Sequence, residues 1–292
     1  MDRLRDKNLY YVGGVVRDEL LGVQSFDTDF CYEGDAIEFA NKNFKQNIIK
    51  TNPDFGTVRL CIDDKEIDIA STREESYPKP GHLPVVNNIG CSLSDDLRRR
   101  DFTINAMAKN TLTGEIYDPL NGLADLKSKT LKILHKNSFI DDPTRIVRAL
   151  KFSVRFGFEL EPVTKRLQEE YLADINYDMS CHRLKKELTE TFNLNSAEAF
   201  DKFVKTGIYR LLGDNQPDVK ISGAQIRDAI GENFANPWII YMSFFDLSNL
   251  PLTRTEKRIL EWAERLKIEK ATNNTPRESI VINNILRNSD KC

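Results

Sequence analysis

Two aspartates, Asp27 and Asp29, stand two residues apart in a strand-like segment of the chain. Side chains two positions apart leave the same face of an extended strand, so these two carboxylates can converge on one point. Two carboxylates about 4 Å apart repel each other by roughly 4 kcal/mol at an effective dielectric constant near 20, and a divalent cation between them removes that cost. The pair therefore predicts a metal site with Asp27 and Asp29 as ligands.

A glycine pair, Gly13 and Gly14, precedes the aspartates, between an apolar strand-like segment (9–12) and a segment with a helical pattern (15–22). Glycines at such a junction let backbone N–H groups approach a ligand at the positive end of the helix, and Arg17 adds a positive charge one turn further on. The pattern predicts a phosphate-binding turn. It lacks the Gly-Lys-Ser/Thr ending of a P-loop and the third glycine of a dinucleotide-binding turn, which excludes both.

A third carboxylate, Asp68, lies in the segment 56–71, which predicts a hairpin with its turn at 63–65. Alternation along the second strand puts Glu66, Asp68 and Ala70 on one face and Ile67 and Ile69 on the other. Asp68 can face the same cleft as Asp27 and Asp29 if its strand lies beside theirs, which would give three carboxylates for two metal ions. The alternative is an ordinary solvated strand residue.

A helix that opens at Asp142 and Pro143 carries the next candidate site. Asp142 suits the N-cap and Pro143 the first helical position, and Arg145, Arg148 and Lys151 recur every three residues on one face. A carboxylate accepts hydrogen bonds and a guanidinium donates them in a planar fork, so the two together could read the edge of a nucleobase. In the alternative reading Asp142 is only a cap and the arginines are solvated.

The elements that position these residues change character near residue 140. The first half mixes short β-rich segments with helices, and the second half has helical periodicity almost throughout, so the pattern predicts an α/β domain followed by an all-α part. Within the first half we expect a helix over 35–44, a long and functional loop over 72–91, and a helix over 92–110. The later helices are expected near 196–212, 224–232, 237–247, 253–267 and 277–287.

Composition limits the classes of protein. The chain has 292 residues, 40% of them hydrophobic, and a net charge of −3, which argues against a strongly basic nucleic-acid-binding coat. Its first residues are too polar for a signal peptide, and no apolar run reaches the roughly 18 residues of a membrane span, so we expect a cytoplasmic protein without a membrane partner. The five cysteines show no zinc-binding spacing, and we expect reduced thiols and no structural metal.

These segments together resemble one family. YYVGGVVRDELLG followed by DTD resembles the head motif of the class II tRNA nucleotidyltransferases, the CCA-adding enzymes and bacterial poly(A) polymerases of the polymerase-β superfamily. RRDFTINAMA is similar to that family's ribose-binding motif, and DDPTRIVRALKF resembles its base-reading motif. The resemblance covers about residues 8–190. It implies a nucleotidyltransferase head with a mixed sheet and helices (1–138), a helical neck (139–212) and a short helical body (213–292).

The resemblance also implies a role for each candidate residue. Asp27 and Asp29 would bind Mg²⁺, with Asp68 as the third catalytic carboxylate. The residues that would bind the nucleotide are Gly13, Gly14, Arg17, Arg99, Arg100, Asp101, Asn105, Asp142, Arg145, Arg148 and Lys151. Either Arg99 or Arg100 would contact the nucleotide. Asp141 occupies the position of the family's glutamate, and Lys151 stands where another arginine is expected.

The implied reaction adds CMP or AMP, from CTP or ATP, to the 3′ end of tRNA and releases pyrophosphate. The segment 54–58 is similar to the CCA-adding version of its strand, and the loop 73–91 is long enough for the loop associated with terminal A addition. Poly(A) addition, a nucleotidyltransferase acting on a target other than tRNA, and a non-catalytic RNA-binding relative remain alternatives. His182 replaces the glutamate of the family's neck motif, and the helical half is shorter than the neck, body and tail of typical members. The resemblance therefore leaves open whether this half binds tRNA as usual, differently or with a separate chain.

Overall fold

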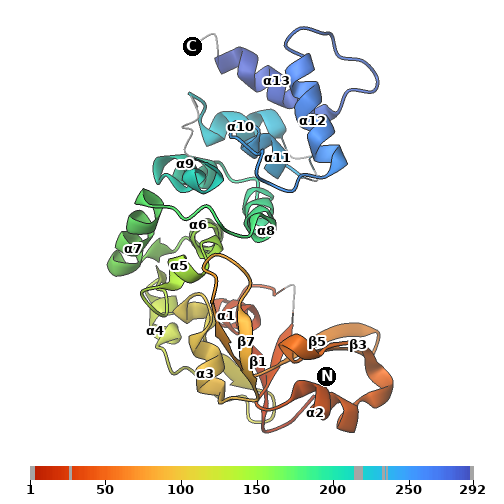
Figure 1. The fold of residues 1–292 in the computed structure, drawn as a ribbon, viewed down its shortest axis with the longest axis vertical. Coiled ribbons are helices and arrows are strands. Elements are labelled where there is room, and N and C mark those ends of the chain that lie inside the picture. Colours follow the sequence, from red (N-terminus) through yellow and green to blue (C-terminus); the bar gives the residue numbers. More distant parts are fainter. Residues whose placement is uncertain (1–3, 26–27, 214–219, 232–233, 235, 290–292) are drawn as a thin grey trace. The chain divides into compact units, whose positions relative to one another are not determined.

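The computed structural model describes residues 4–25, 28–213, 220–231, 234 and 236–289. The chain divides into two compact units, which are described separately below. Unit 1 consists of Met1–Asp141 and Glu159–Thr164, and unit 2 of Asp142–Phe158 and Lys165–Cys292. Unit 1 contains the strands, and the described part of unit 2 contains helices (Figure 1). This confirms the predicted class, an α/β head followed by helices, while the finer division into neck and body stays a prediction.

A seven-stranded mixed sheet forms the centre of unit 1, with the strand order β3-β4-β5-β2-β1-β8-β9. β2 and β5 pair in parallel, and the other neighbours pair antiparallel. The predicted strand before the glycine pair and the predicted hairpin are both present. The strands are β1 (Leu9–Val12), β2 (Asp29–Tyr32), β3 (Ile48–Asn52), β4 (Thr57–Ile62), β5 (Lys65–Ser71), β8 (Ala108–Asn110) and β9 (Ile116–Tyr117).

Helices cover parts of both faces of this sheet. α2 (Ala36–Asn43) begins at its N-cap Asp35 and packs against β4 and β5, where Ile69 and Leu60 are fully buried. On the other face, α3 (Leu93–Arg98) packs Leu97 against the residues of β1, β2 and β8. The alternation of β4 and β5 therefore leaves a second face of these strands open to solvent.

The segment predicted as a long loop contains a two-stranded hairpin, so that prediction was wrong. β6 (Arg73–Ser76) pairs antiparallel with β7 (Val85–Ile89), and a register shift interrupts the pairing at Glu74 and Glu75. The strands are short and largely polar, so they lack the apolar alternation by which strands are recognised in a sequence. The three prolines and Gly81 lie between the two strands, and the segment's other glycine, Gly90, follows β7.

The helix expected over 92–110 is shorter than predicted. Ser92 caps α3 as expected, accepting a hydrogen bond from the Asp95 N–H, but the helix ends at Arg98. A 3-10 helix (Thr103–Asn105) and β8 follow, because the apolar residues there are buried against the sheet. The remaining elements of unit 1 are α1 (Gly14–Leu21), 3-10 helices Lys45–Asn47 and Pro53–Phe55, α4 (Gly122–Lys127), β10 (Thr130–Leu131), α5 (Ser138–Asp141) and β11 (Glu159–Leu160).

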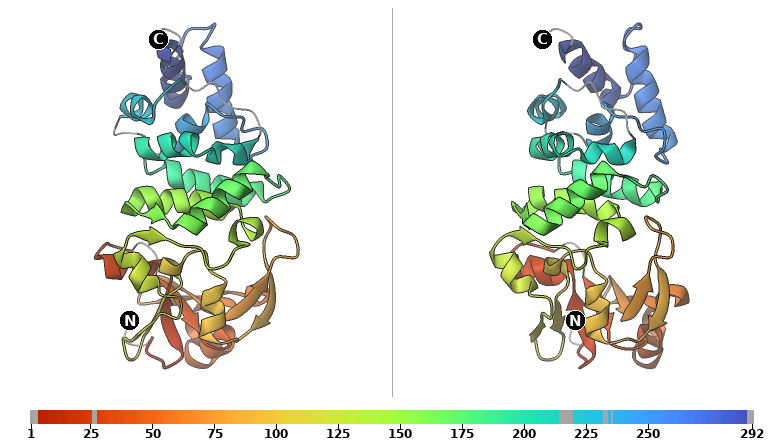
Figure 2. Two further views of the ribbon diagram at one scale, coloured as in Figure 1. Left: turned by 90° about the vertical axis from the view of Figure 1, so that its left-hand side faces the viewer. Right: turned by 60° about the vertical axis from the view of Figure 1, so that its left-hand side comes forward.

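Unit 2 is built around buried aromatic rings. Phe200 and Tyr241 are fully buried, and the ring of Phe200 lies 5.9 Å from those of Tyr241 and Phe245. Two further views show the helices of this unit stacked on one another (Figure 2). They are α6 (Thr144–Phe156), α7 (Pro162–Ala173, which begins in unit 1), α8 (Cys181–Phe192), α9 (Ala197–Lys205), a 3-10 helix (Ile208–Leu212), α10 (Gly223–Ile230), α11 (Trp238–Met242), α12 (Arg254–Arg265) and α13 (Arg277–Ser289). None of the described helices combines the length and apolar character that crossing a bilayer requires.

Replacing Phe200 by alanine should lower the free energy of unfolding of unit 2 by about 3–5 kcal/mol, because the lost ring leaves a cavity among other rings. The chain's two tryptophans, Trp238 and Trp262, both lie in unit 2, so urea unfolding followed by tryptophan fluorescence reports on this unit. Ile268, whose side chain is 93% exposed, provides the control Ile268→Ala, which should leave the midpoint unchanged. Equal midpoints for the two variants would contradict the assignment of Phe200 to the core.

Candidate functional site

Two of the three predicted carboxylates lie on neighbouring strands of unit 1. Asp29 on β2 and Asp68 on β5 are direct Cα partners in the parallel pairing, and both side chains are exposed on the open face of the sheet. This confirms that the strand of Asp68 lies beside that of Asp29. Asp27 lies outside the described residues.

The donors brought together by this pairing suit a hard divalent cation. Mg²⁺ prefers carboxylate and water oxygens and is commonly held by only one or two carboxylates. Among the described residues, no group of three or more His, Cys, Asp or Glu side chains is close enough to hold a metal ion. Asp29 and Asp68 therefore supply two carboxylates of the predicted set, and the chemistry of these donors fits the ion.

The predicted glycine turn is present at the start of α1, where Gly13 adopts a φ of 67°. A side chain at Gly13 would be strained, and its Cβ would lie 3.0 Å from Nη1 of Arg100. The Nε atom of Arg100 is buried and has no hydrogen-bond partner in the described structure. The glycine thus allows a guanidinium with spare donor capacity to lie against the turn, which is what an anionic ligand requires.

Arg17 is buried beside this turn and is held by neighbouring side chains. Its Nε and Nη2 atoms donate to Asp18 at 2.8 and 2.6 Å, and its Nη1 atom donates to Asn105 at 2.5 Å. Asn105 in turn donates to Asp101 at 3.0 Å. This network fixes the three nucleotide-binding candidates Arg17, Asn105 and Asp101 relative to one another.

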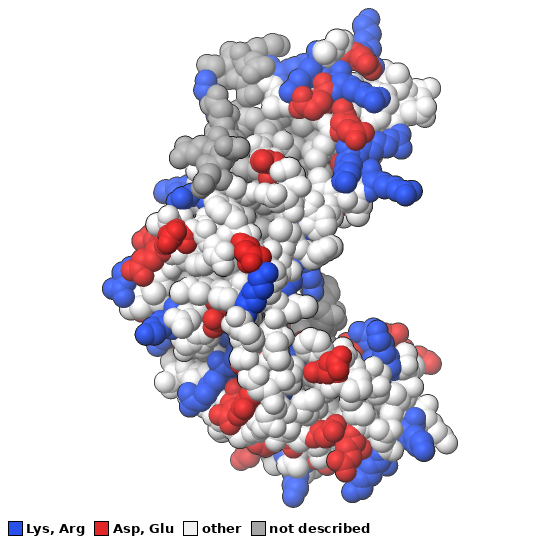
Figure 3. Space-filling model, in the orientation of Figure 1, with Lys and Arg blue, Asp and Glu red and all other residues white. Residues whose placement is uncertain are grey.

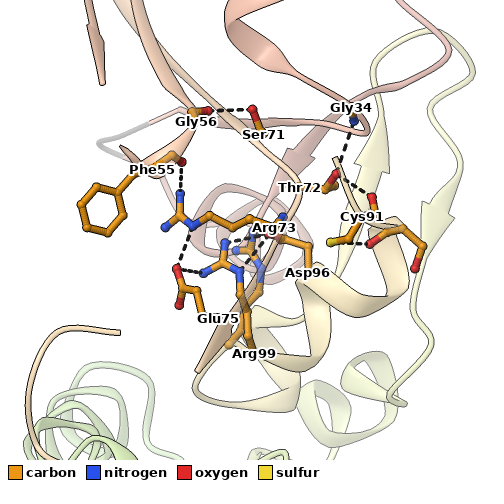
Figure 4. A network of polar contacts seen from close by, with 12 residues as sticks. Gly34, Phe55, Gly56, Ser71, Thr72, Arg73, Glu75, Cys91, Asp96 and Arg99 are labelled. Carbon is orange, nitrogen blue, oxygen red and sulfur yellow. Dashed lines mark hydrogen bonds and ion pairs between the residues drawn. The ribbon is translucent and has the colours of Figure 1, made fainter. Parts of the chain in front are cut away.

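The structure distinguishes the arginines that follow α3. Arg99 donates to Asp96 and Glu75 and lies beside Arg73, which also donates to Glu75 (Figure 4). Arg99 therefore joins α3 to the β6–β7 hairpin, whereas Arg100 reaches the glycine turn. Asp96 holds both arginines. Its burial acts to raise its pKa, but Arg100 and Arg99 outweigh that effect and leave the pKa below its usual range.

Asp142 at the start of α6 in unit 2 is 4% exposed and firmly held. It accepts hydrogen bonds from the backbone N–H of Thr144 at 3.2 Å and from its hydroxyl at 2.6 Å, and it forms an ion pair with Arg183. The prediction of Asp142 as the N-cap was wrong by one residue, because α6 begins at Thr144 with Pro143 at the N-cap, and Asp142 holds the first helical residue from just before the cap. Arg145 is also buried, with Nε 3.9 Å from the Asp142 carboxylate.

The rest of the predicted cationic stripe is not a solvated helix face. Lys151 donates to Glu187 at 2.7 Å and to Glu190 at 2.6 Å, and Arg148 donates to Glu187 at 3.0 Å. These acidic residues belong to α8, which packs against α6. Lys151 is 9% exposed, and the alternative reading of solvated arginines is wrong for Arg145, which is 3% exposed.

Sequence reasoning missed two cationic residues beside the carboxylates. A pocket of about 440 Å³ on the open face of the sheet is lined by Lys50 and Arg59 together with Asp29, Asp68 and Arg100. Arg59 could have been found from the sequence, because the tight turn at 63–65 fixes which residues of the hairpin face each other, and Arg59 faces Asp68.

Comparison with known proteins agrees with this geometry. Residues 9–132 match the family model described as the poly(A) polymerase head domain. The chain is similar to the A-adding tRNA nucleotidyltransferase of Aquifex aeolicus (45% identity over 55% of this chain and 20% of the relative) and to that of Halalkalibacterium halodurans (39% over 65% and 47%). It is also similar to the CCA-adding enzyme of Lactobacillus gasseri (34% over 68% and 50%). The chain spans half or less of the length of these relatives.

Solved structures give the same assignment over nearly the whole chain. A CCA-adding enzyme in an apo form matches with a TM-score of 0.74 and 25% identity, covering 97% of this chain and 78% of the other. A tRNA nucleotidyltransferase complexed with a primer tRNA and an incoming ATP analogue matches with a TM-score of 0.71 and 27% identity, covering 97% and 92%. Residues 9–132 thus carry the poly(A) polymerase head domain, and over nearly its whole length the chain is similar in fold to the class II tRNA nucleotidyltransferases.

Proposed function

We propose that this protein adds nucleotides to the 3′ end of tRNA, using ATP and CTP. The observation that carries the proposal is the pairing of Asp29 with Asp68 in the same sheet as the turn where Arg100 lies against Gly13. The tRNA nucleotidyltransferase relatives support tRNA as the acceptor. Addition of the terminal A is favoured over full CCA addition, because the A-adding relatives of Aquifex aeolicus and Halalkalibacterium halodurans are 45% and 39% identical and the CCA-adding enzyme of Lactobacillus gasseri is 34% identical. We place the activity in the cytoplasm.

Unit 1 would bind the triphosphate through the backbone of Gly13 and Gly14 and the guanidinium of Arg100. Backbone N–H groups at a helix start and a guanidinium both suit phosphate oxygens. Arg17, Asp101 and Asn105 would hold the sugar side of the nucleotide as one hydrogen-bonded group. Arg99 would act indirectly, by fixing Asp96 and the β6–β7 hairpin.

Members of this family use a divalent metal, and we propose Mg²⁺ held by Asp27 and Asp29 with Asp68 as the third carboxylate. When bound, the ion would favour the ionised 3′-hydroxyl and offset charge on the triphosphate. The carboxylates keep the reacting groups in place while the 3′-oxygen of the RNA attacks the α-phosphorus. The bond from that phosphorus to the bridging oxygen breaks, pyrophosphate leaves, and the hydroxyl proton passes to solvent.

Base selection would fall to Asp142 and Arg145 in unit 2. The carboxylate accepts hydrogen bonds and the guanidinium donates them, so the pair can match the donors and acceptors of cytosine or adenine. Thr144 and Arg183 hold the orientation of Asp142. Arg148 and Lys151 support the same helix through Glu187 on α8.

The acceptor and the nucleotide can be tested together with Mg²⁺, labelled ATP or CTP, and tRNA ending at the discriminator base, at C or at CC. We expect label from ATP on the CC-ended tRNA. Label from CTP on the two shorter tRNAs would assign full CCA addition instead. Long ladders from ATP on any RNA would assign poly(A) addition, and no transfer with any substrate would contradict the proposal.

Replacing either strand carboxylate, as Asp29→Asn or Asp68→Asn, should reduce transfer of both nucleotides at least about a hundredfold, because each removes a charge that holds the metal ion. Initial rates with saturating ATP and CC-ended tRNA measure the effect. Asp64→Asn is the matched control, since Asp64 lies in the turn of the same hairpin at a φ of 60° that asparagine tolerates. Full activity of Asp68→Asn would refute the role of the third carboxylate.

Asp142→Asn should lower the selectivity among ATP, CTP, UTP and GTP, expressed as the ratios of their kcat/KM values, by about tenfold. The change replaces a group that only accepts hydrogen bonds with one that both donates and accepts them. Asparagine keeps a side-chain oxygen that can accept the two hydrogen bonds from Thr144, so the fold should persist. Ratios of kcat/KM for the four nucleotides measure selectivity, and Glu198→Gln on α9 provides a control charge change in the same unit. Unchanged ratios in the Asp142 variant would exclude base reading by this residue.

A further inference from the structure

Four charged residues form a row across the open face of the unit 1 sheet. Lys50 on β3 is the direct partner of Arg59 on β4, Arg59 is the partner of Asp68 on β5, and Asp68 is the partner of Asp29 on β2. All four are exposed, and all line the same pocket. Figure 3 shows basic and acidic side chains interspersed over the visible face of the molecule, whereas this row has two cations at one end and two anions at the other.

Arg59 is oriented by its acidic neighbours but not saturated by them. Nε and Nη2 donate to the two oxygens of Asp68 at 2.7 and 2.8 Å, and Nη1 donates to Glu66 at 3.2 Å. A guanidinium has five N–H groups, so two remain after these three bonds. Lys50 has no hydrogen bond or ion pair to any described residue, and its ammonium group can bind a further anion.

The chemistry of transfer indicates which anion this is, and this step depends on the proposed function. In an in-line displacement the attacking oxygen and the leaving pyrophosphate lie on opposite sides of the α-phosphorus. The glycine turn that would hold the triphosphate follows β1, on one side of β2. The acceptor RNA must then approach from the other side of β2, over β5, β4 and β3, where Arg59 and Lys50 lie.

We propose that Arg59 and Lys50 bind the backbone phosphates next to the 3′-terminal nucleotide of the acceptor RNA. They are positioning residues, which place the 3′-hydroxyl beside Asp68 without contacting the reacting atoms. Arg59 suits the RNA phosphate that lies next to Asp68, because its guanidinium is already oriented by its two hydrogen bonds to that carboxylate. Lys50, one strand further out, suits the next phosphate along the chain.

Binding of a fluorescent RNA minihelix ending in CC to the full chain, with Mg²⁺ and no nucleotide, tests this subsite. Arg59→Gln and Lys50→Gln should each bind the RNA about threefold more weakly, the scale of an exposed ion pair. The slope of log K against log salt should fall by about 0.7 for each phosphate contact removed from a single strand. Lys42→Gln is the matched control, because Lys42 is exposed on α2, which covers the opposite face of the sheet.

A second RNA, with a neutral methylphosphonate at the last internucleotide linkage, distinguishes a phosphate contact from a structural effect. Wild type should bind this RNA about threefold more weakly than the charged one. Arg59→Gln should bind both equally, and Arg59→Lys should restore part of the difference. In turnover the Arg59 variant should raise KM for RNA and leave KM for ATP unchanged.

The outcomes separate this subsite from the proposed function. If wild type binds the minihelix and the Arg59 and Lys50 variants match Lys42→Gln in affinity and salt slope, the subsite is refuted and the proposed function stands. A full methylphosphonate penalty in Arg59→Gln also refutes it. If wild type shows no affinity for the minihelix, tRNA is not the acceptor, and the subsite is refuted together with the proposed function.

Discussion

The parallel pairing of β2 with β5 is the constraint on which the site of unit 1 depends. It makes Asp29 and Asp68, which are far apart in the sequence, direct partners on a face that no helix covers at this point. A slip of one residue in either strand would turn its carboxylate toward the buried face, where Phe30 and Ile69 now pack. The apolar packing under α2 therefore also sets the position of the charged groups above it.

Buried acids hold the arginines of this protein in defined places. Asp96 has no exposed surface and forms ion pairs with both Arg99 and Arg100. Asp18 forms an ion pair with Arg17, and Glu187 on α8 forms one with Arg148. A buried charge is tolerated only when it is paired, so each acid fixes the arginine that satisfies it. Donors that are already oriented lose little freedom when a phosphate or a base arrives, which favours both binding and catalysis.

Sequence patterns predicted the elements whose signals are local. The strand, glycine turn and helix of 9–22, the hairpin with its turn at 63–65 and the cap of α3 at Ser92 are all present. The β6–β7 hairpin is not predicted because its strands lack apolar alternation. The helix after Ser92 is predicted to be longer than it is, because the apolar residues of the following 3-10 helix and strand continue the helical pattern. Helical and extended segments can both carry short apolar runs, and only burial against the sheet separates them.

The roles of neighbouring charged residues depend on contacts that no local pattern contains. Arg99 and Arg100 are equivalent in the sequence, and only the close approach of Arg100 to Gly13 separates them. Spacing along α6 left open that its arginines are solvated, but Arg145 is buried and Arg148 donates to Glu187, which comes from α8. Lys50 and Arg59 could be recognised as neighbours of the carboxylates only from the strand register, which places them in line with Asp68.

We propose that carboxylates from two paired strands hold divalent metal beside the glycine turn. A crystal structure with Mn²⁺ in place of Mg²⁺ and a non-hydrolysable ATP analogue tests it most directly, since manganese is located by its anomalous scattering. The account predicts a manganese peak about 2.1 Å from oxygens of Asp29 and of a nucleotide phosphate, with Asp68 bound to this ion or to one beside it. A manganese and nucleotide site away from both Asp29 and Asp68 would contradict it.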